Sequence, residues 1–451
     1  MSDGAATQGN DLDLLAELLT TARKAGADSA DAVLFESSSL EVSYRLGEPE
    51  DLERSESRDL GLRVFMGQRQ AIVSSTDLGK AALDELVERA VAMARVAPED
   101  PYCGLADPAR LCAAPPELDL LDADEPTPER LYDQAGRAEA AALAVDGVTN
   151  SDGAGAGWGR SSVALATTGG FAGGYAASSH SVHASVVAGE GTGMERDYDF
   201  TSARYAADLD DPDALGRAAG ERAVRRLNPR KVASTQVPVV YDPRVSRSLL
   251  GHFSGAISGQ AVARGTSFLK DAMGDAVFGD AIVVVDDPHR PRGLASKPFD
   301  GEGVANERRT LIDGGRLQTW LLDSSAARQL GLETTGHAAR GTSGPPSPSS
   351  SNLYMQPGTL TPEAMIGEID DGFYVTELIG FGVNGVTGDY SRGAAGFWIE
   401  KGQLAYPVSE LTIAGNLKEM FLNVTPADDL EFRYGSNAPT LRVDGMMVAG
   451  T

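Results

Sequence analysis

Apolar residues recur every three to four positions in several stretches of the N-terminal half, a spacing that predicts amphipathic helices. The stretch 15–22 shows this spacing, and Gly26 follows it as a stop. The stretch 83–94 shows it again, and Thr76 or Asp77 is suited to cap the helix that it predicts. Two helices are therefore expected within the first hundred residues.

Two further helices are predicted before the middle of the chain. Thr127 and Pro128 form a start signal, an N-cap residue followed by proline at the first helical position, ahead of an apolar face within 131–142. An alanine-rich helix is expected over 211–227. The segment 97–126, rich in Pro, Asp and Ala, is typical of a long connection.

Between these helices the pattern changes to the alternation of apolar and polar residues that is typical of strands. Residues 32–44 predict a strand pair or one long strand, and 60–65 with 70–74 predict a hairpin around Gly67. From 148 to 205 small residues alternate between glycine turns. The N-terminal half is thus expected to mix helices with a sheet.

A polar stretch at 228–231 marks a boundary. After it, 236–241 predicts a short strand, and Asp242 with Pro243 opens one or two helices that run to about Gly259. The remainder shows short strands between Gly, Asp and Pro, which is typical of a barrel or sandwich; they are expected at 281–285, 318–322, 373–379, 397–400 and 411–413.

The predicted fold class is therefore α+β, with two domains. Residues 1–230 form a mixed α/β domain, and residues 231–451 form a mainly antiparallel, barrel-like β domain. No repeat of 20 to 50 residues is evident.

Composition adds limits on partners. Hydrophobic residues make up 42% of the chain and charged residues 23%, which allows a normal packed core. The 39 basic and 65 acidic residues give a formal charge of −26. Because binding to phosphates requires a basic surface, nucleic acid is not expected as the main partner.

The chain shows no targeting or membrane signal. Residues 1–10 lack the basic start and apolar run of a signal peptide, and no apolar window approaches 18 residues. The two cysteines, Cys103 and Cys112, lie in one proline-rich stretch and do not make a disulfide framework. A cytoplasmic, reducing location is expected, without membrane association.

Metal binding by this chain is poorly supported. The HExxH motif is absent, and His180 and His183 are the only close histidine pair. In a strand, positions three apart face opposite sides of the sheet, so these two cannot share a metal ion. The other histidines are His252, His289 and His337, and neither cysteine lies near any histidine in the sequence.

Motifs for nucleophiles and phosphates are also weak. A Gly-x-Ser-x-Gly elbow is absent, although Ser254 and Ser258 lie near His252, and a triad built from distant residues stays open. The stretch 153–159 fails the G-x-G-x-x-G spacing at Trp158 and precedes strand sequence, which favours a hairpin tip.

Two glycine-rich segments, 340–354 and 380–396, are the main candidate contact regions. Glycine lets the backbone approach a ligand or another chain closely, and extended backbone can pair with a peptide. The alternative is that both are ordered surface loops. The residues expected to contact a peptide or a second subunit are Arg340, Asn352, Tyr354, Asp389, Tyr390 and Arg392; Arg340 or Arg392 is suited to bind a carboxylate.

Long strings of sequence also resemble one protein family. They are Gly61-Leu-Arg-Val-Phe65, Ser74-Ser-Thr-Asp-Leu78, Leu249-Leu-Gly-His-Phe253, Ala263-Arg-Gly-Thr-Ser-Phe268, Phe299-Asp-Gly-Glu-Gly303, Thr335-Gly-His-Ala338 and Gly388-Asp-Tyr-Ser-Arg-Gly393. With these, nearly the whole chain resembles the TldD/PmbA family, most closely its PmbA (TldE) branch.

The resemblance implies where a zinc site would lie. The TldD branch carries HExxxH upstream of a Gly-Thr-Ser, and a cysteine shortly before an Ile-Glu-x-Gly turn; such ligands leave one zinc position open for water. Counting back from Gly265-Thr-Ser267 and from Ile399-Glu-Lys-Gly402 gives the corresponding positions in this chain. They are Leu250 and Gly255 for the histidines, Gly251 for the glutamate and Gly393 for the cysteine.

The resemblance therefore implies a subunit without metal or catalytic residues of its own, paired with a TldD-type zinc peptidase that trims small unfolded peptides, such as precursors of modified peptides and antitoxins. It implies an α/β N-terminal domain and a barrel-like C-terminal domain. Zinc is expected only in the partner, and whether this chain forms a homodimer when the partner is missing stays open. Two other functions stay open: a self-associating peptide-binding module, and an autonomous hydrolase with an unrecognised nucleophile.

Overall fold

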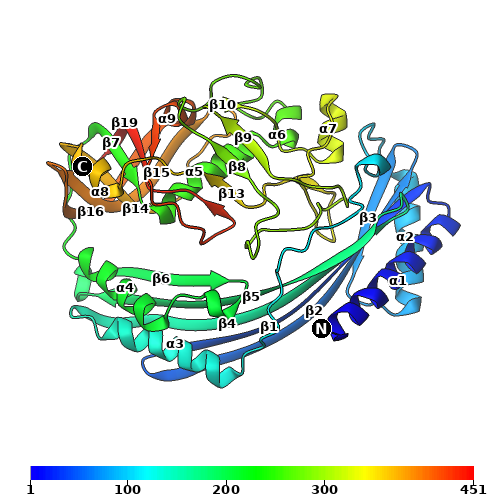
Figure 1. The fold of residues 1–451 in the computed structure, drawn as a ribbon, viewed down its shortest axis with the longest axis horizontal. Helices are drawn as coiled ribbons and strands as arrows, with labels where there is room; N and C mark the ends of the chain where they lie inside the picture. Colours follow the sequence, from blue (N-terminus) through cyan, green and yellow to red (C-terminus); the bar gives the residue numbers. More distant parts are fainter. Residues whose placement is uncertain (1, 451) are drawn as a thin grey trace.

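In the computed structural model, which describes residues 2–450, the N-terminal half is organised around one six-stranded antiparallel sheet in the order β3-β2-β1-β4-β5-β6. Figure 1 shows its long strands curving beneath the C-terminal half. The strands are β1 (Ser29–Arg45), β2 (Glu48–Met66), β3 (Arg69–Ser75), β4 (Val148–Thr167), β5 (Ala172–Ala188) and β6 (Glu195–Ala203).

The turn between β1 and β2 sets the register of the longest hairpin. Leu46 and Gly47 have φ angles of 51° and 83°, the left-handed pair that a two-residue hairpin turn requires. Leucine rarely adopts such a conformation, and a neighbouring carboxylate compensates. Glu139 accepts the backbone N–H groups of Leu46 and Gly47 at 2.8 and 2.9 Å.

Four helices cover one face of this sheet, namely α1 (Ser2–Lys24), α2 (Lys80–Val96), α3 (Pro128–Leu143) and α4 (Pro212–Arg225). Alternate side chains of β1 point toward them: Leu34 packs in the core beneath α1 and α2, and Leu40 packs beneath α3. Val33 is adjacent to Leu34, so its side chain points to the opposite face of the sheet, where it packs against Phe299 of the C-terminal half. The uncovered face of the sheet therefore meets the C-terminal half.

The C-terminal half contains a closed five-stranded barrel in the order β16-β15-β14-β7-β19, completed by pairing of β16 with β19. Its strands are β7 (Thr235–Tyr241), β14 (Asp371–Ile379), β15 (Asp389–Glu400), β16 (Gln403–Asn416) and β19 (Leu441–Ala449), and β17 (Val424–Pro426) pairs with β19 outside the ring. Helices α5 (Pro243–Ala256) and α9 (Leu417–Leu422) contribute to the same core.

A second, smaller sheet lies beside the barrel in the order β10-β9-β8-β13-β18. Its strands are β8 (Val284–Asp286), β9 (Arg309–Asp313), β10 (Arg316–Leu317), β13 (Leu353–Met355) and β18 (Ser436–Asn437). The remaining elements are α6 (Gly259–Ala263), α7 (Ser324–Leu330), α8 (Pro362–Gly367), the strand pair β11 (Ala338–Ala339) and β12 (Ser347–Pro348), and the 3-10 turns at Pro108–Arg110, Gly191–Gly193 and Ala206–Asp208.

The predicted fold class is confirmed: a mixed α/β N-terminal half precedes a mainly antiparallel, barrel-containing β half. The predicted caps also hold where proline follows them. Thr127 accepts the N–H of Arg130 and opens α3, while Asp242 accepts the N–H of Arg244 and opens α5. Fixed φ at the following proline makes this signal strong.

Four local predictions were wrong. The stretch 153–159 is not a hairpin tip but lies within β4. Neither Thr76 nor Asp77 is the N-cap of α2, because Gly79 holds that position. The side chain of Asp77 instead accepts the N–H of Gly79, in a turn just before the helix. No strand spans 318–322, because the chain leaves the small sheet after Leu317. The segment 380–396 is only partly a loop: β15 begins at Asp389.

Within residues 2–450, none of the helices is both long enough and apolar enough to cross a lipid bilayer.

Candidate functional site

Three of the four zinc-site positions that the resemblance implies lie on α5, on two faces of the helix. Leu250 is 1% exposed and packs in the barrel core with Leu249 and Phe253. Gly251 and Gly255 lie on the exposed face, and a Cβ built at either would meet nothing within 4 Å. A side chain at 250 would thus point into the core, whereas side chains at 251 and 255 would point outward.

Gly393 lies on β15, where a Cβ would come within 3.3 Å of Ile379 on the neighbouring strand. These four positions offer neither nitrogen, oxygen nor sulfur side-chain ligands, so the residues present do not fit zinc. Within residues 2–450, no group of three or more His, Cys, Asp or Glu is arranged to hold a metal ion. His180 is buried and His183 exposed, on opposite faces of β5 as the alternation predicted.

His252 is the titratable side chain nearest to these positions in sequence. Its ring lies edge-on to Tyr390, with centroids 6.0 Å apart. Burial, and next the charge of Arg392, lower the pKa of His252. A neutral imidazole beside a cation can accept a proton or a hydrogen bond, but neither Asp nor Glu orients it within hydrogen-bonding distance in the described part of the chain.

The candidate contact residues of the first glycine-rich segment are mostly used within the fold. Asn352 is 1% exposed, accepts the N–H of Ala295 and donates to Asp287 O and Ser296 Oγ. Tyr354 packs edge-on against Phe432 with ring centroids 5.1 Å apart. The alternative that both segments are ordered surface loops is therefore incorrect at Asn352, which is buried.

The second segment keeps an exposed tip. Asp389 accepts hydrogen bonds from Thr387 and Asn416 at the surface, whereas Tyr390 is 1% exposed. Arg392 is half-buried and donates to Ile379 O at 3.3 Å. Beside them Phe381 is 97% exposed, an unusual degree of exposure for an aromatic side chain.

A chain of Asp, His and Thr side chains occurs elsewhere in the C-terminal half. His337 Nε2 lies 3.3 Å from Asp286 Oδ2, and His337 Nδ1 lies 2.8 Å from Thr335 Oγ1. Thr335 is buried, however, and its Oγ1 accepts the N–H of Leu322 at 2.8 Å. The network therefore holds the loop at 335–337 and does not expose a nucleophile.

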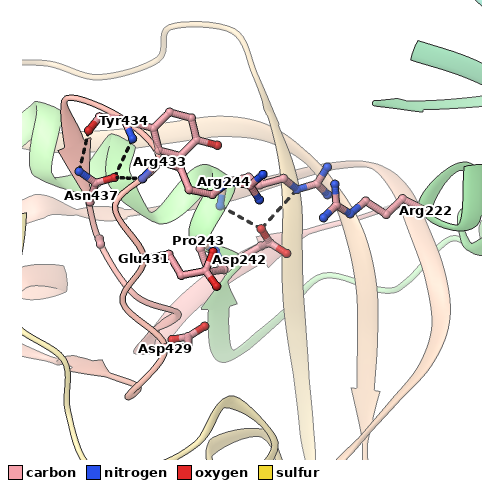
Figure 2. A pocket seen from close by; sticks show the side chains of 10 residues that line it. Arg222, Asp242, Pro243, Arg244, Asp429, Glu431, Arg433, Tyr434 and Asn437 are labelled. Atoms are coloured by element: carbon pink, nitrogen blue, oxygen red, sulfur yellow. Dashed lines mark hydrogen bonds and ion pairs between the residues drawn. The ribbon is translucent and has the colours of Figure 1, made fainter. Parts of the chain in front are cut away.

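A polar cavity of about 230 Å³ lies where α4 meets the start of α5 and the segment before β18. Figure 2 shows three arginines and three carboxylates around it. Each arginine has an acidic partner: Arg244 lies 2.8 Å from Asp197, Arg222 lies 3.0 Å from Asp199, and Arg433 lies 2.7 Å from Asp210. The arginines of this cavity are therefore paired within the protein.

A different charged cluster lies at the other end of the junction between the two halves. Asp31 of β1 lies between two arginines, with Arg63 Nη2 and Arg340 Nη2 each 2.5 Å from one of its oxygens. Glu302 lies 3.7 Å from Arg63, and all four side chains are at most 5% exposed. Arg340 is thus a buried side chain within the fold rather than part of a surface loop, and its binding of a peptide carboxylate stays a prediction.

Of the four residues of this cluster, only Arg340 was singled out in the sequence. The available signal was Asp31 itself, an acidic residue within an otherwise apolar stretch, 30–35. Such a residue in a buried strand implies a cationic partner, but the partner's position comes only from folding.

Comparison with known proteins agrees with this architecture. Residues 30–94, 121–227 and 234–450 match, in order, models of the PmbA/TldA metallopeptidase domain 1, central domain and C-terminal domain. The chain is 39% identical to Metalloprotease PmbA of Escherichia coli O157:H7 over 442 residues, which covers 97% of this chain and 96% of that protein. A PmbA homolog of Haemophilus influenzae is 37% identical over 95% of this chain and 94% of that protein.

Solved structures share the fold. A protein of Bacteroides thetaiotaomicron, described as a candidate modulator of DNA gyrase, superposes with a TM-score of 0.90 at 28% identity, over 97% of this chain and 98% of that chain. TldE from Thermococcus kodakarensis superposes with a TM-score of 0.86 at 22% identity, over 97% and 100% of the two chains, which shows the fold alone. The chain therefore belongs to the PmbA/TldD metallopeptidase family, in its PmbA (TldE) branch.

Proposed function

We propose that this chain is the metal-free, non-catalytic subunit of a cytoplasmic two-subunit peptidase of the TldD/TldE type. The zinc-bearing subunit activates water, and this chain supplies an interface and part of the peptide-binding surface. The substrates are small unfolded peptides, such as precursors of modified peptides and antitoxins.

The identity of the residues at the ligand positions is the observation that carries this proposal. Leucine and glycine cannot bind zinc, and at Leu250 even a histidine would point into the hydrophobic core. Restoring a site would therefore require repacking α5 as well as four substitutions, since burying an unpaired polar ring in a core is costly.

Metal analysis and peptidase assays of the purified chain, alone and mixed with its HExxxH homologue, test the proposal. The chain alone should contain much less than one zinc per molecule and cleave none of several unfolded peptides. The mixture should cleave them and lose activity on chelation. One tightly held zinc per chain, or cleavage by the chain alone, would contradict the proposal.

The exposed tip at residues 379–386 is the proposed contact surface for the second subunit. Ile379, Phe381 and Val386 are 58%, 97% and 56% exposed, beside the predicted contact residues Asp389 and Arg392. Apolar side chains gathered at one tip favour association with another protein.

Phe381→Ser should weaken co-purification of the two subunits at least about tenfold, because exposed aromatic anchors dominate interfaces. Because Phe381 contributes little to the core, the variant should have the same melting temperature as the wild type. Val96→Ser is the matched control, because Val96 is 84% exposed at the end of α2 in the other half. Equal co-purification of both variants would exclude this tip as the interface.

Two alternatives have distinct outcomes in the same experiments. A self-associating peptide-binding module would stay a homodimer even when the homologue is co-expressed. An autonomous hydrolase would show activity that resists chelators, and Thr335→Val would abolish that activity if the Asp286–His337–Thr335 chain were responsible.

A further inference from the structure

A second cavity, of about 190 Å³, lies between the uncovered face of the N-terminal sheet and the C-terminal half. One side is made by Val33 and Phe35 of β1, Val163 and Leu165 of β4, and Tyr175 of β5. The other side is made by residues 297–301 and 338–340. Phe35, Val163 and Tyr175 are only half-buried, so the cavity has access to solvent on the side of the sheet.

Its apolar wall is rigid. Phe299 is 2% exposed and packs edge-on against Phe171 and Tyr175, with ring centroids 4.8 and 5.5 Å away. Gly301 allows the two C-terminal segments to come together, because a Cβ there would lie 2.8 Å from the Cβ of Arg340. The shape of the cavity is therefore fixed by packing and does not depend on a mobile loop.

Two basic residues that line the cavity, Arg340 and Lys297, are not fully paired within the protein. Arg340 uses Nη2 for Asp31, but its buried Nε and Nη1 have no acceptor in the described part of the chain. Lys297 donates to Ala338 O at 3.2 Å, and no salt bridge to it is found among residues 2–450. Buried donors left unpaired are costly, so an acceptor bound in the cavity would gain most of that energy.

The acidic residue that lines the cavity is already engaged. Asp300 Oδ1 accepts the N–H groups of Glu302 and Val304, and its Oδ2 accepts that of Ala338. Burial raises the pKa of Asp300 to about 7, which lowers its negative charge at neutral pH. Repulsion of an incoming anion by Asp300 is therefore reduced. Burial lowers the pKa of Lys297 and of Arg340, and an anion bound beside them would favour their charged forms.

We propose that this cavity binds the C-terminal residue of a peptide, with its free carboxylate at Arg340 and Lys297 and an apolar side chain against Phe299 and Leu165. The volume is smaller than the ~300–1,000 Å³ of sites for drug-sized ligands, so one residue enters and the rest of the peptide extends outward. The choice of a peptide as the source of the carboxylate rests on the proposed function. The choice of a carboxylate as the ligand rests on the hydrogen-bond donors of Arg340 and Lys297.

Binding of three probes to the purified chain, by calorimetry, tests the proposal. The probes are an acetylated tripeptide ending in leucine with a free carboxylate, the same tripeptide as its C-terminal amide, and N-acetyl-leucine. The free acid should bind at least about tenfold tighter than the amide, since charge-assisted hydrogen bonds are the strong ones. Equal binding of acid and amide would overturn the carboxylate site, and binding of N-acetyl-leucine without binding of the tripeptide acid would overturn the peptide assignment.

Variants locate the site without disturbing the Asp31 cluster. Val163→Phe fills the cavity and Lys297→Met keeps the aliphatic stem without the charge, so each should weaken binding of the acid at least about tenfold. Val187→Phe, at another half-buried position of the same sheet, is the matched control and should bind as the wild type does. Wild-type affinity in both cavity variants would overturn the proposal.

Co-purification with the HExxxH homologue separates this inference from the proposed function. The Val163→Phe variant should still form the complex, because Val163 lines the cavity between the two halves and is not part of the proposed contact tip at 379–386. Loss of peptide binding with an intact complex would support the cavity alone, and an intact cavity without any complex would contradict only the two-subunit proposal.

Discussion

The two charged clusters that join the halves of this protein differ in how completely their arginines are paired. In the cavity of Figure 2, each of Arg222, Arg244 and Arg433 has its own carboxylate within 3.0 Å. In the Asp31 cluster, one aspartate is shared by two arginines, and Arg340 keeps donors without acceptors. Complete pairing stabilises the junction, whereas incomplete pairing next to a cavity also leaves capacity to bind an anion.

Removing the shared carboxylate should have the largest effect. Asp31→Asn leaves the buried guanidinium of Arg340 without an anionic partner and that of Arg63 with only Glu302 at 3.7 Å, which should cost about 3–5 kcal/mol of the free energy of unfolding. Urea unfolding measures it. Glu56→Gln, which breaks a well-exposed pair with Arg54, is the control and should change little. A loss as small as that of the control would mean that Asp31 does not hold the junction.

The free energy of unfolding should also depend on pH through Asp300, which lines the cavity beside the Asp31 cluster. Because burial raises the pKa of Asp300 to about 7, the folded state binds this proton more tightly than the unfolded state does. Stability from this group is therefore present below about pH 4 and is lost as pH rises toward 7, by on the order of 2–4 kcal/mol.

The difference in unfolding free energy between the wild type and Asp300→Asn, measured from pH 4 to pH 8, isolates this term. The difference should change up to about pH 7 and then level off. Parallel curves for the two proteins would show that Asp300 titrates normally.

Gly301→Ala probes the packing beside Arg340. The added Cβ would lie 2.8 Å from the Cβ of Arg340, so the segments must separate, at a cost of about 2 kcal/mol. A lowered melting temperature together with weaker binding of the tripeptide acid is expected. Gly344→Ala has open space at its Cβ and a φ outside the left-handed region, and it should behave as the wild type. If both variants melt alike, the contact at Gly301 is not tight.

The fully paired cluster should respond least. Arg244→Met keeps most of the aliphatic volume, and Asp197 retains Arg226 at 3.5 Å, so about 1.5 kcal/mol is expected. Binding of the tripeptide acid should not change, because this cluster lies at the other end of the junction. A loss matching that of Asp31→Asn would show that pairing in the two clusters is equally critical and would remove the contrast between them.

The sequence predicts local structure well where backbone chemistry is decisive. The pairs Thr127-Pro128 and Asp242-Pro243 set the starts of α3 and α5, because an N-cap acceptor and a fixed φ act within a few residues. Thr76 and Asp77 misled, because a side chain that accepts a nearby N–H forms a turn as readily as a cap.

The site was less predictable, because its parts are distant in the chain. Asp31 and Arg340 are more than 300 positions apart, and only the packing of sheet against barrel half brings them together. Arg340 was singled out for its glycine-rich neighbours, but glycine spacing does not reveal whether a segment ends up at the surface or, as here, beneath it. The positions 250, 251, 255 and 393, which correspond to the zinc ligands and the glutamate of the TldD branch, could be found only through the family resemblance.

Closure of the barrel also constrains how the chain is made. Strand β7 lies between β14 and β19 in the barrel. During synthesis, β7 emerges about 200 residues before the strand that completes its hydrogen bonding. Pairing over such a separation is slow, and an unpaired edge is prone to aggregation. Strand β19 therefore acts as a checkpoint for folding: a chain that lacks it leaves the barrel open, whatever the state of its N-terminal sheet.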